Sequence, residues 1–112
     1  MKILCPSKAK EPYASVISEL AKRTRVNVEF VKTVPEGEYI VLDEHGESVN
    51  VEMLKKTIRP NSVFVVGGPD GIKISGRKIS LGSYTLNHQI AIIVLLELLF
   101  RVMNPTHPYN KH

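Results

Sequence analysis

Cysteine is almost absent from this sequence, and long apolar runs are absent altogether. Cys5 is the only cysteine among 112 residues, so neither an internal disulfide nor a zinc site built on several cysteines can form. The longest apolar run, 90–96, has about a third of the ~20 residues that a membrane-spanning helix needs. Residues 1–5 are too short for the apolar part of a signal peptide. We therefore expect a soluble, cytoplasmic protein with no metal and no membrane partner.

Phosphate-binding motifs are also missing. The segment Gly67-Gly-Pro-Asp-Gly71 follows an apolar run, but it contains neither the Gly-Lys-Ser/Thr of a P-loop nor the spacing G-x-G-x-x-G. Asp70 adds a hydrogen-bond acceptor and no cation. Ligands of parallel α/β sheets bind beyond the carboxyl ends of strands, so this turn favours a neutral or cationic ligand with hydroxyl groups. A tight turn without a ligand is an equally good interpretation of the turn alone.

Charge is only mildly unbalanced. The formal net charge is +4 and the pI is about 9.3. An excess of this size is compatible with an RNA partner and equally with an ordinary solvated surface. Apolar residues make up 43% of the chain and no low-complexity tract interrupts it, which predicts one globular domain over residues 1–112.

Strand-like and helix-like segments alternate along the chain. The predicted strands are 2–5, 26–31, 39–42, 63–66 and 79–81, and the predicted helices are 11–23, 48–58 and 88–103. This alternation predicts an α/β fold with a mostly parallel sheet and helices on its faces. Residues 32–38 look too short for a crossover between parallel strands. Strand 26–31 is therefore expected either to pair antiparallel with 39–42 or to lie elsewhere.

The final helix is apolar nearly all the way round from Ile90 to Phe100, with Glu97 as the one charge. A helix with one exposed face would show a polar stripe. We expect a second copy of the chain to cover it in a homodimer. A central helix buried within one domain is the alternative.

The segment 80–88 links the last predicted strand to this helix. It mixes small, hydroxyl-bearing and apolar residues, which suits a loop whose backbone groups contact an adenine ring among leucine side chains. The alternative is a plain connection that ends in a good helix cap, Asn87.

Taken together, these segments resemble a known family, the large-subunit ribosomal RNA methyltransferase H family of the SPOUT superfamily. The similarity covers the chain from Val63 onward. The motifs that carry it are residues 64–71, residues 79–88, Glu97, Phe100-Arg101 and residues 107–109.

The resemblance implies a SPOUT-type α/β fold with helices on both faces of the sheet and a C-terminal trefoil knot. It also implies a homodimer that binds S-adenosylmethionine near the subunit interface and methylates N3 of a pseudouridine in 23S ribosomal RNA. The cofactor-binding residues that it implies are Leu42, Gly67, Gly71, Leu81, Gly82, Ser83, Tyr84, Thr85 and Leu86.

Methyl transfer to such a base needs donor and acceptor in line and removal of the acceptor proton. The catalytic candidates are His88, Tyr109 and Lys111, and the candidates for contact with RNA are Arg101, His107 and Lys111. Tyr109 suits stacking on a base and Lys111 suits a phosphate. Each candidate has a structural alternative: a helix cap for His88, an ion pair with Glu97 for Arg101, and a chain end without a role for 107–112.

Two other functions stay open. One is a SPOUT enzyme that acts on another RNA, such as tRNA. The other is a non-catalytic dimer of the same fold that binds RNA or the cofactor. Ile92 and Asn110 favour the second, because the family usually carries Arg and His at these positions.

Overall fold

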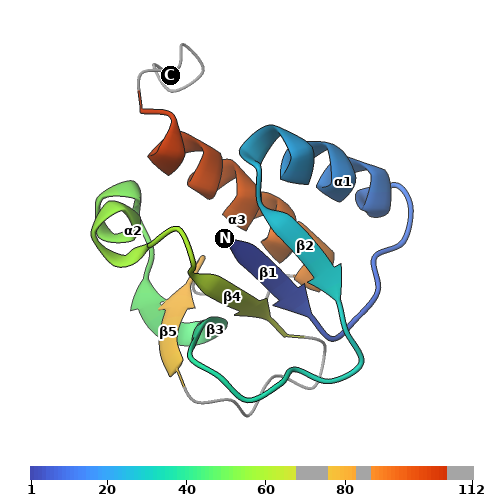
Figure 1. Ribbon diagram of the computed structural model, residues 1–112, viewed down its shortest axis with the longest axis horizontal. Helices are drawn as coiled ribbons and strands as arrows, with labels where there is room; N and C mark the ends of the chain where they lie inside the picture. Colours follow the sequence, from blue (N-terminus) through green and yellow to red (C-terminus); the bar gives the residue numbers. More distant parts are fainter. Residues whose placement is uncertain (68–75, 83–86, 106–112) are drawn as a thin grey trace.

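The computed structural model describes residues 1–67, 76–82 and 87–105, in which strands and helices alternate (Figure 1). The strands are β1 (Lys2–Cys5), β2 (Asn27–Phe30), β3 (Tyr39–Ser48), β4 (Val63–Val66) and β5 (Gly76–Ser80). The helices are α1 (Tyr13–Thr24), α2 (Val51–Thr57) and α3 (His88–Met103). None of the described helices is long and apolar enough to cross a membrane.

The strands form one sheet in the order β2-β1-β4-β3-β5, and every pairing is parallel. Phe64 at the centre lies opposite Ile3 on one side and Ile40 on the other. The predicted α/β fold with a parallel sheet is confirmed. Because all strands run the same way, their carboxyl ends share one edge of the sheet and their amino ends share the opposite edge.

Local sequence explains where the helices begin and end. The Asn50 side chain accepts a hydrogen bond from the Met53 backbone N at 2.8 Å and caps α2. Asn87 does the same for α3, accepting from the Gln89 backbone N at 2.8 Å. Helix α1 ends at Thr24, and the next residue, Arg25, has a left-handed backbone (φ 61°) and an N–H that donates to the last turn of the helix.

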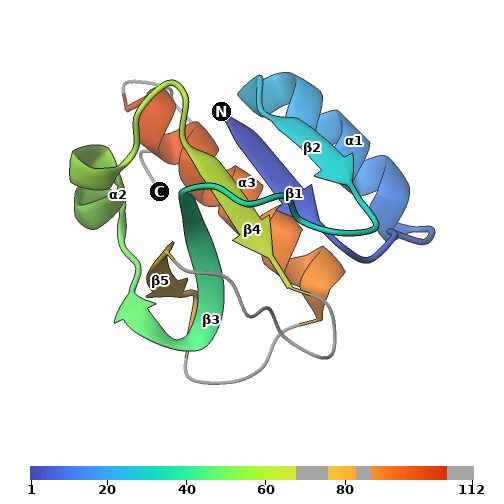
Figure 2. The same cartoon turned by 60° about the horizontal axis from the view of Figure 1, so that its bottom comes forward.

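All three described helices pack on the same face of the sheet. Strand residues alternate between faces, and those that face the helices form one core cluster with the helix residues. The cluster joins Ile3, Phe64 and Val66 of the strands to Leu54 of α2 and Leu96 of α3. The expectation of helices on both faces is therefore wrong for the described helices. No helix lies between β2 and β3 to cover the other face; residues 31–38 cross it instead (Figure 2).

The crossing by residues 31–38 also corrects the expectation that this link is too short to join parallel strands. Strand β2 lies at the edge of the sheet beside β1, elsewhere than next to β3. The link must cross three strand spacings, about 14 Å, and return by three residues along the strands, about 10 Å. The straight-line distance between its ends is therefore roughly 17 Å. Eight extended residues reach roughly 26 Å. The dozen-residue rule assumes a helix in the connection, and an extended strap needs fewer residues.

Helix α3 is the central helix of its layer. Eight of its residues, from Gln89 to Val102, are buried by the sheet and the flanking helices. Ile90, Val94 and Glu97 stay half-buried along one stripe. The single chain therefore explains most of the apolar character of this helix, and the homodimer stays a prediction. The trefoil knot also stays a prediction, because 68–75 and 83–86 lie outside the described residues.

Candidate functional site

The carboxyl edge of β3, β4 and β5 brings together cofactor-binding residues that the resemblance implied. Leu42 lies opposite Val66 of β4 on one side and Ile79 of β5 on the other. Gly67 follows Val66 directly, and Leu81 lies two residues past Ile79. The side chains of Leu42 and Leu81 both pack against the core cluster. Three chain segments far apart in the sequence thus meet at one edge.

Ser80 shapes the exit of the chain from β5, a role that the sequence did not reveal. Its side chain is buried, and its Oγ donates to the Gly82 carbonyl at 2.6 Å. The same oxygen lies 3.2 Å from the Glu44 carbonyl and accepts from the Gly82 N–H at 3.2 Å. These bonds fix the direction in which residues 81 and 82 leave the sheet. They also join that exit to strand β3.

Strand β3 bends round β5 just beyond Leu42. Leu42 and Glu47 both pair with Ile79, so residues 43–46 form a bulge between them. Gly46 lies so close to β5 that an added Cβ would be 2.6 Å from the Lys78 carbonyl carbon. The bulge therefore requires glycine here, and it holds the backbone around Leu42 in place.

His88 begins α3 beside the carboxyl end of β1. Its Nε2 lies 3.1 Å from the Lys8 carbonyl oxygen, and Gln89 Oε1 accepts from the Lys10 backbone N at 2.5 Å. The helix cap is Asn87, so His88 does not serve as the cap. Both contacts fasten the segment after β1 to the start of α3. No sequence signal pointed to the Gln89 contact, since it joins residues 79 positions apart.

Asp43 places a carboxylate at this edge, where the Lys78 ammonium group pairs with it. Asp43 follows Leu42; its carboxylate accepts from the His45 backbone N at 2.9 Å and lies 3.8 Å from the Lys78 ammonium group.

Burial raises the pKa of the Cys5 thiol at the end of β1, and a hydrogen bond from the Ser7 backbone has a weaker, opposite effect. Cys5 therefore stays protonated and is a poor nucleophile. The described residues contain no group of three or more His, Cys, Asp or Glu that could hold a metal ion.

Arg101 lies far from this edge. It is exposed in the last turn of α3, and the helix places it about 20 Å from His88. Glu97, its expected partner, is bound by Arg23 of α1, whose guanidinium also lies 4.4 Å from the centre of the Phe100 ring. The remaining predicted residues lie outside the described residues: Gly71, Ser83, Tyr84, Thr85, Leu86, His107, Tyr109 and Lys111.

Comparison with known proteins agrees with the resemblance seen in the sequence. A family profile described as "Predicted SPOUT methyltransferase" matches residues 1–110. Proteins named "Ribosomal RNA large subunit methyltransferase H" are similar in sequence. The one from Xylella fastidiosa (strain 9a5c) is 35% identical over 85 residues, covering 64% of this chain and 54% of the relative.

Two further proteins of the same name are similar over longer stretches. The one from Parabacteroides distasonis is 32% identical over 100 residues, which cover 78% of this chain and 64% of the relative. The one from Acidovorax ebreus (strain TPSY) is 30% identical over 105 residues, which cover 81% of this chain and 65% of the relative. The chain therefore matches about half to two thirds of the length of these relatives.

Proposed function

Because the chain belongs to the SPOUT methyltransferase family, we propose that it transfers a methyl group from S-adenosylmethionine to RNA. The proposed acceptor is a pseudouridine or uridine of large-subunit ribosomal RNA, the substrate class in the names of the similar proteins. The observation that carries the proposal is the meeting of Leu42, Gly67 and Leu81 at one edge of the sheet. This edge carries backbone groups, apolar side chains and Asp43, which fit a nucleoside with a sulfonium group.

The proposed cofactor site combines described and undescribed segments. Leu42, Leu81 and Gly82 would pack against the adenosine, and Gly67 would let the backbone approach it closely. Gly71 and residues 83–86 complete the set, within a C-terminal trefoil knot. When bound, S-adenosylmethionine supplies an electrophilic methyl group. The chain's own part is to hold the donor in line with the base and to exclude water.

His88 is the proposed proton acceptor. Its Nε2 lies at hydrogen-bond distance from the Lys8 carbonyl oxygen, which can only accept, so Nε2 must carry the hydrogen. In a neutral ring the lone pair would then be on Nδ1, where it could take the N–H proton of the base. Tyr109 would stack on the base, and Lys111, His107 and Arg101 would contact the RNA backbone.

The place of these groups along α3 supports the proposal of a homodimer. The helix holds 16 residues and is about 24 Å long. His88 stands at its start, whereas residues 106–112 follow its far end. Tyr109 of one subunit reaches the His88 of the same subunit only by returning along the whole helix. Reaching the site of a second copy needs no such return, so we propose that each site is completed by the partner subunit.

Two measurements test the proposal. Calorimetry with S-adenosylmethionine should show binding, and Gly67→Val should abolish it because the side chain would occupy the backbone approach. Lys32→Ala, in the exposed link formed by residues 31–38, is the control variant and should bind normally. Mass mapping of ribosomal RNA from a deletion strain, treated with purified protein and donor, should then show one added methyl group. No binding of the donor by the wild-type protein would refute the proposal.

One observation favours a second candidate, a dimer that binds donor and RNA without transfer. Ile92 is fully buried in the core cluster, so this position offers no side chain to RNA. Binding of donor and RNA without a mass change in any RNA tested would support this candidate over the enzyme.

A further inference from the structure

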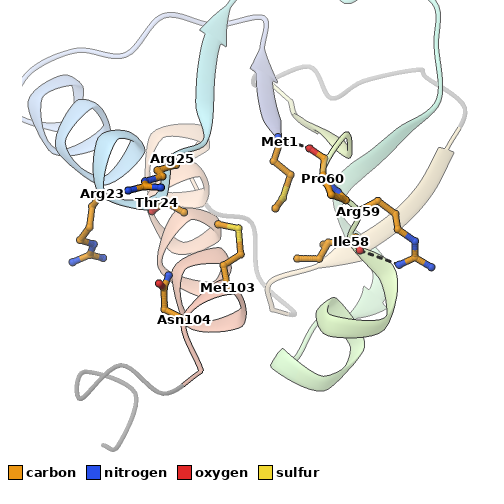
Figure 3. Close-up of a pocket in the computed structure, with 9 residues that line it drawn as sticks. All are labelled: Met1, Arg23, Thr24, Arg25, Ile58, Arg59, Pro60, Met103 and Asn104. Atoms are coloured by element: carbon orange, nitrogen blue, oxygen red, sulfur yellow. Dashed lines mark hydrogen bonds between the residues drawn. The ribbon is translucent and has the colours of Figure 1, made fainter.

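A hollow of about 710 Å³ opens at the amino edge of the sheet, opposite the proposed cofactor site. Figure 3 shows its two sides. The ends of α1 and α3 form one side, with Arg23, Arg25 and Asn104, and the connection from α2 to β4 forms the other, with Arg59. The start of β1 lies between them, where the Met1 nitrogen donates to the Pro60 carbonyl at 2.7 Å. The volume is within the range of about 300–1,000 Å³ that is typical of small-molecule sites.

The lining described for this hollow is basic and contains no acidic residue. The parallel fold explains the concentration of charge. Each helix runs back against the strands, so the last turns of all three helices end at this edge, with Lys22 and Arg23 in α1, Lys55 and Lys56 in α2 and Arg101 in α3. Glutamates pair with three of these cations: Glu19 with Lys22, Glu97 with Arg23 and Glu52 with Lys55.

Helix capping would be the ordinary reason for such residues, because cations stabilise the carboxyl ends of helices. Arg59 fits this reason, since its Nη1 donates to the carbonyls of Lys56 and Ile58. Arg25 does not. The end of α1 is capped by backbone N–H groups of residues 25 and 26, and the Asn104 side chain donates to the Phe100 carbonyl at the end of α3. The Arg25 side chain is exposed and bonds to none of the described residues.

The lining also includes a polar group without a partner. Thr24 is only 3% exposed, and its hydroxyl oxygen accepts and donates no hydrogen bond within the described part of the chain. A buried hydroxyl without a partner costs about 1–3 kcal/mol, so a native site usually satisfies it. The oxygen itself has almost no accessible surface in this structure, so a ligand or water in the hollow supplies that partner only after the Thr24 side chain rotates.

We propose that this hollow binds a phosphate of the RNA backbone, with Arg25 as the guanidinium that pairs with it and Arg59, whose Nη1 caps α2, adding positive charge from the other side. A guanidinium group pairs with two phosphate oxygens at once, and an arginine that serves no cap is free to do so. The site is separate from the cofactor edge and anchors the RNA away from the reacting base. The identity of the ligand as RNA rests on the proposed function; its anionic character rests on the hollow itself.

The test measures how binding of RNA depends on salt. The probe is a fluorescent uridine oligonucleotide of about 16 nucleotides, and its Kd is taken from anisotropy at several salt concentrations. Each lost phosphate contact should reduce the slope of log K against log salt by about 0.7 for single-stranded RNA. Arg25→Gln should therefore weaken binding roughly 5-fold at 0.1 M salt, and the double variant Arg25→Gln/Arg59→Gln roughly 25-fold.

Lys32→Gln removes the same charge from the exposed strap on the other face of the sheet and is the matched control. It should leave the slope and the affinity close to those of the wild type. The circular dichroism melting curve of each variant separates a lost contact from a lost fold. Arg25→Gln is the more informative single variant, because it removes no hydrogen bond within the described residues.

Three results would overturn the inference: an unchanged slope in the double variant, an equal loss in Lys32→Gln, or no RNA binding by the wild type. Competition by polyglutamate as effective as competition by polyuridine would point to an acidic protein partner and would also overturn it. Binding of S-adenosylmethionine is measured separately and should be unchanged in all variants. If the arginine variants bound RNA as tightly as the wild type while donor binding stayed intact, this inference alone would be refuted.

Discussion

Replacing Gly46 by alanine should be one of the most damaging small changes in this protein. A Cβ at this position would lie 2.6 Å from the Lys78 carbonyl carbon, 2.7 Å from the Ile79 nitrogen and 2.8 Å from the Lys78 oxygen. Ordinary contacts of a Cβ begin at 3.4 Å. All three atoms belong to the backbone of β5, so no side chain can rotate away. Either the bulge of β3 or strand β5 must move.

The cost follows from what holds these two strands. Strand β5 pairs with β3 on both sides of the bulge, and Arg77 binds Glu47 across it at 2.9 Å. Overpacking of a tight site costs typically 1–3 kcal/mol, and a backbone clash belongs at the upper end, about 3 kcal/mol. For a domain of this size that corresponds to a Tm lower by about 12 °C.

Gly37→Ala is the matched control. Its Cβ would meet only the Tyr39 ring, 3.1 Å from the hydroxyl oxygen, and that side chain can shift. Such a shift weakens the bond that the Tyr39 hydroxyl donates to the Pro35 carbonyl, so we expect a change of at most about 1 kcal/mol. Urea denaturation of both variants measures the free energy of unfolding, and calorimetry measures the affinity for S-adenosylmethionine. Gly46→Ala should weaken both, because the bulge also holds Leu42. Equal stability of the two variants would refute the proposed packing of β3 against β5.

Three further changes test other parts of the structure. Ser80→Ala removes the bonds to Gly82 and should cost about 1–2 kcal/mol in urea denaturation and weaken donor binding; full donor affinity would contradict its positioning role. Leu96→Ala opens a cavity at a fully buried position and should cost about 3 kcal/mol, against almost nothing for the exposed Val16→Ala. Burial raises the pKa of Cys5 above its usual 9.0 in the folded state, so the folded thiol keeps a proton that the unfolded chain releases. Stability should thus fall as the pH rises above about 9 and fall less in Cys5→Ala; identical pH profiles would show that the thiol does not contribute.

Patterns of neighbouring residues in the sequence predicted the strands that are buried along most of their length. The predicted strands 2–5 and 63–66 have the observed bounds, and Asn50 and Asn87 cap the predicted helices. Strand β3 continues to Ser48, beyond its predicted end at Leu42. Residues 43–48 are mostly polar, and they are extended only because they bend round β5. A contact between strands so far apart in sequence leaves no periodic signal.

The candidate site was predictable only in part. A glycine turn after a buried strand indicated the carboxyl edge of the sheet, and the resemblance supplied Leu42 and Leu81. Ser80 and Gln89 hold that edge together through hydrogen bonds that depend on the tertiary fold. The arginine-lined hollow could not be foreseen, because it arises where the ends of three helices meet.

The central claim is that the methyl donor binds at the carboxyl edge of β3, β4 and β5. An NMR titration of ¹⁵N-labelled protein with S-adenosylmethionine tests it most directly, because each backbone amide reports on its own surroundings. The account predicts the largest shifts at Leu42, Gly67, Leu81 and Gly82. Shifts confined to the opposite edge, around Arg25 and Asn104, would contradict it.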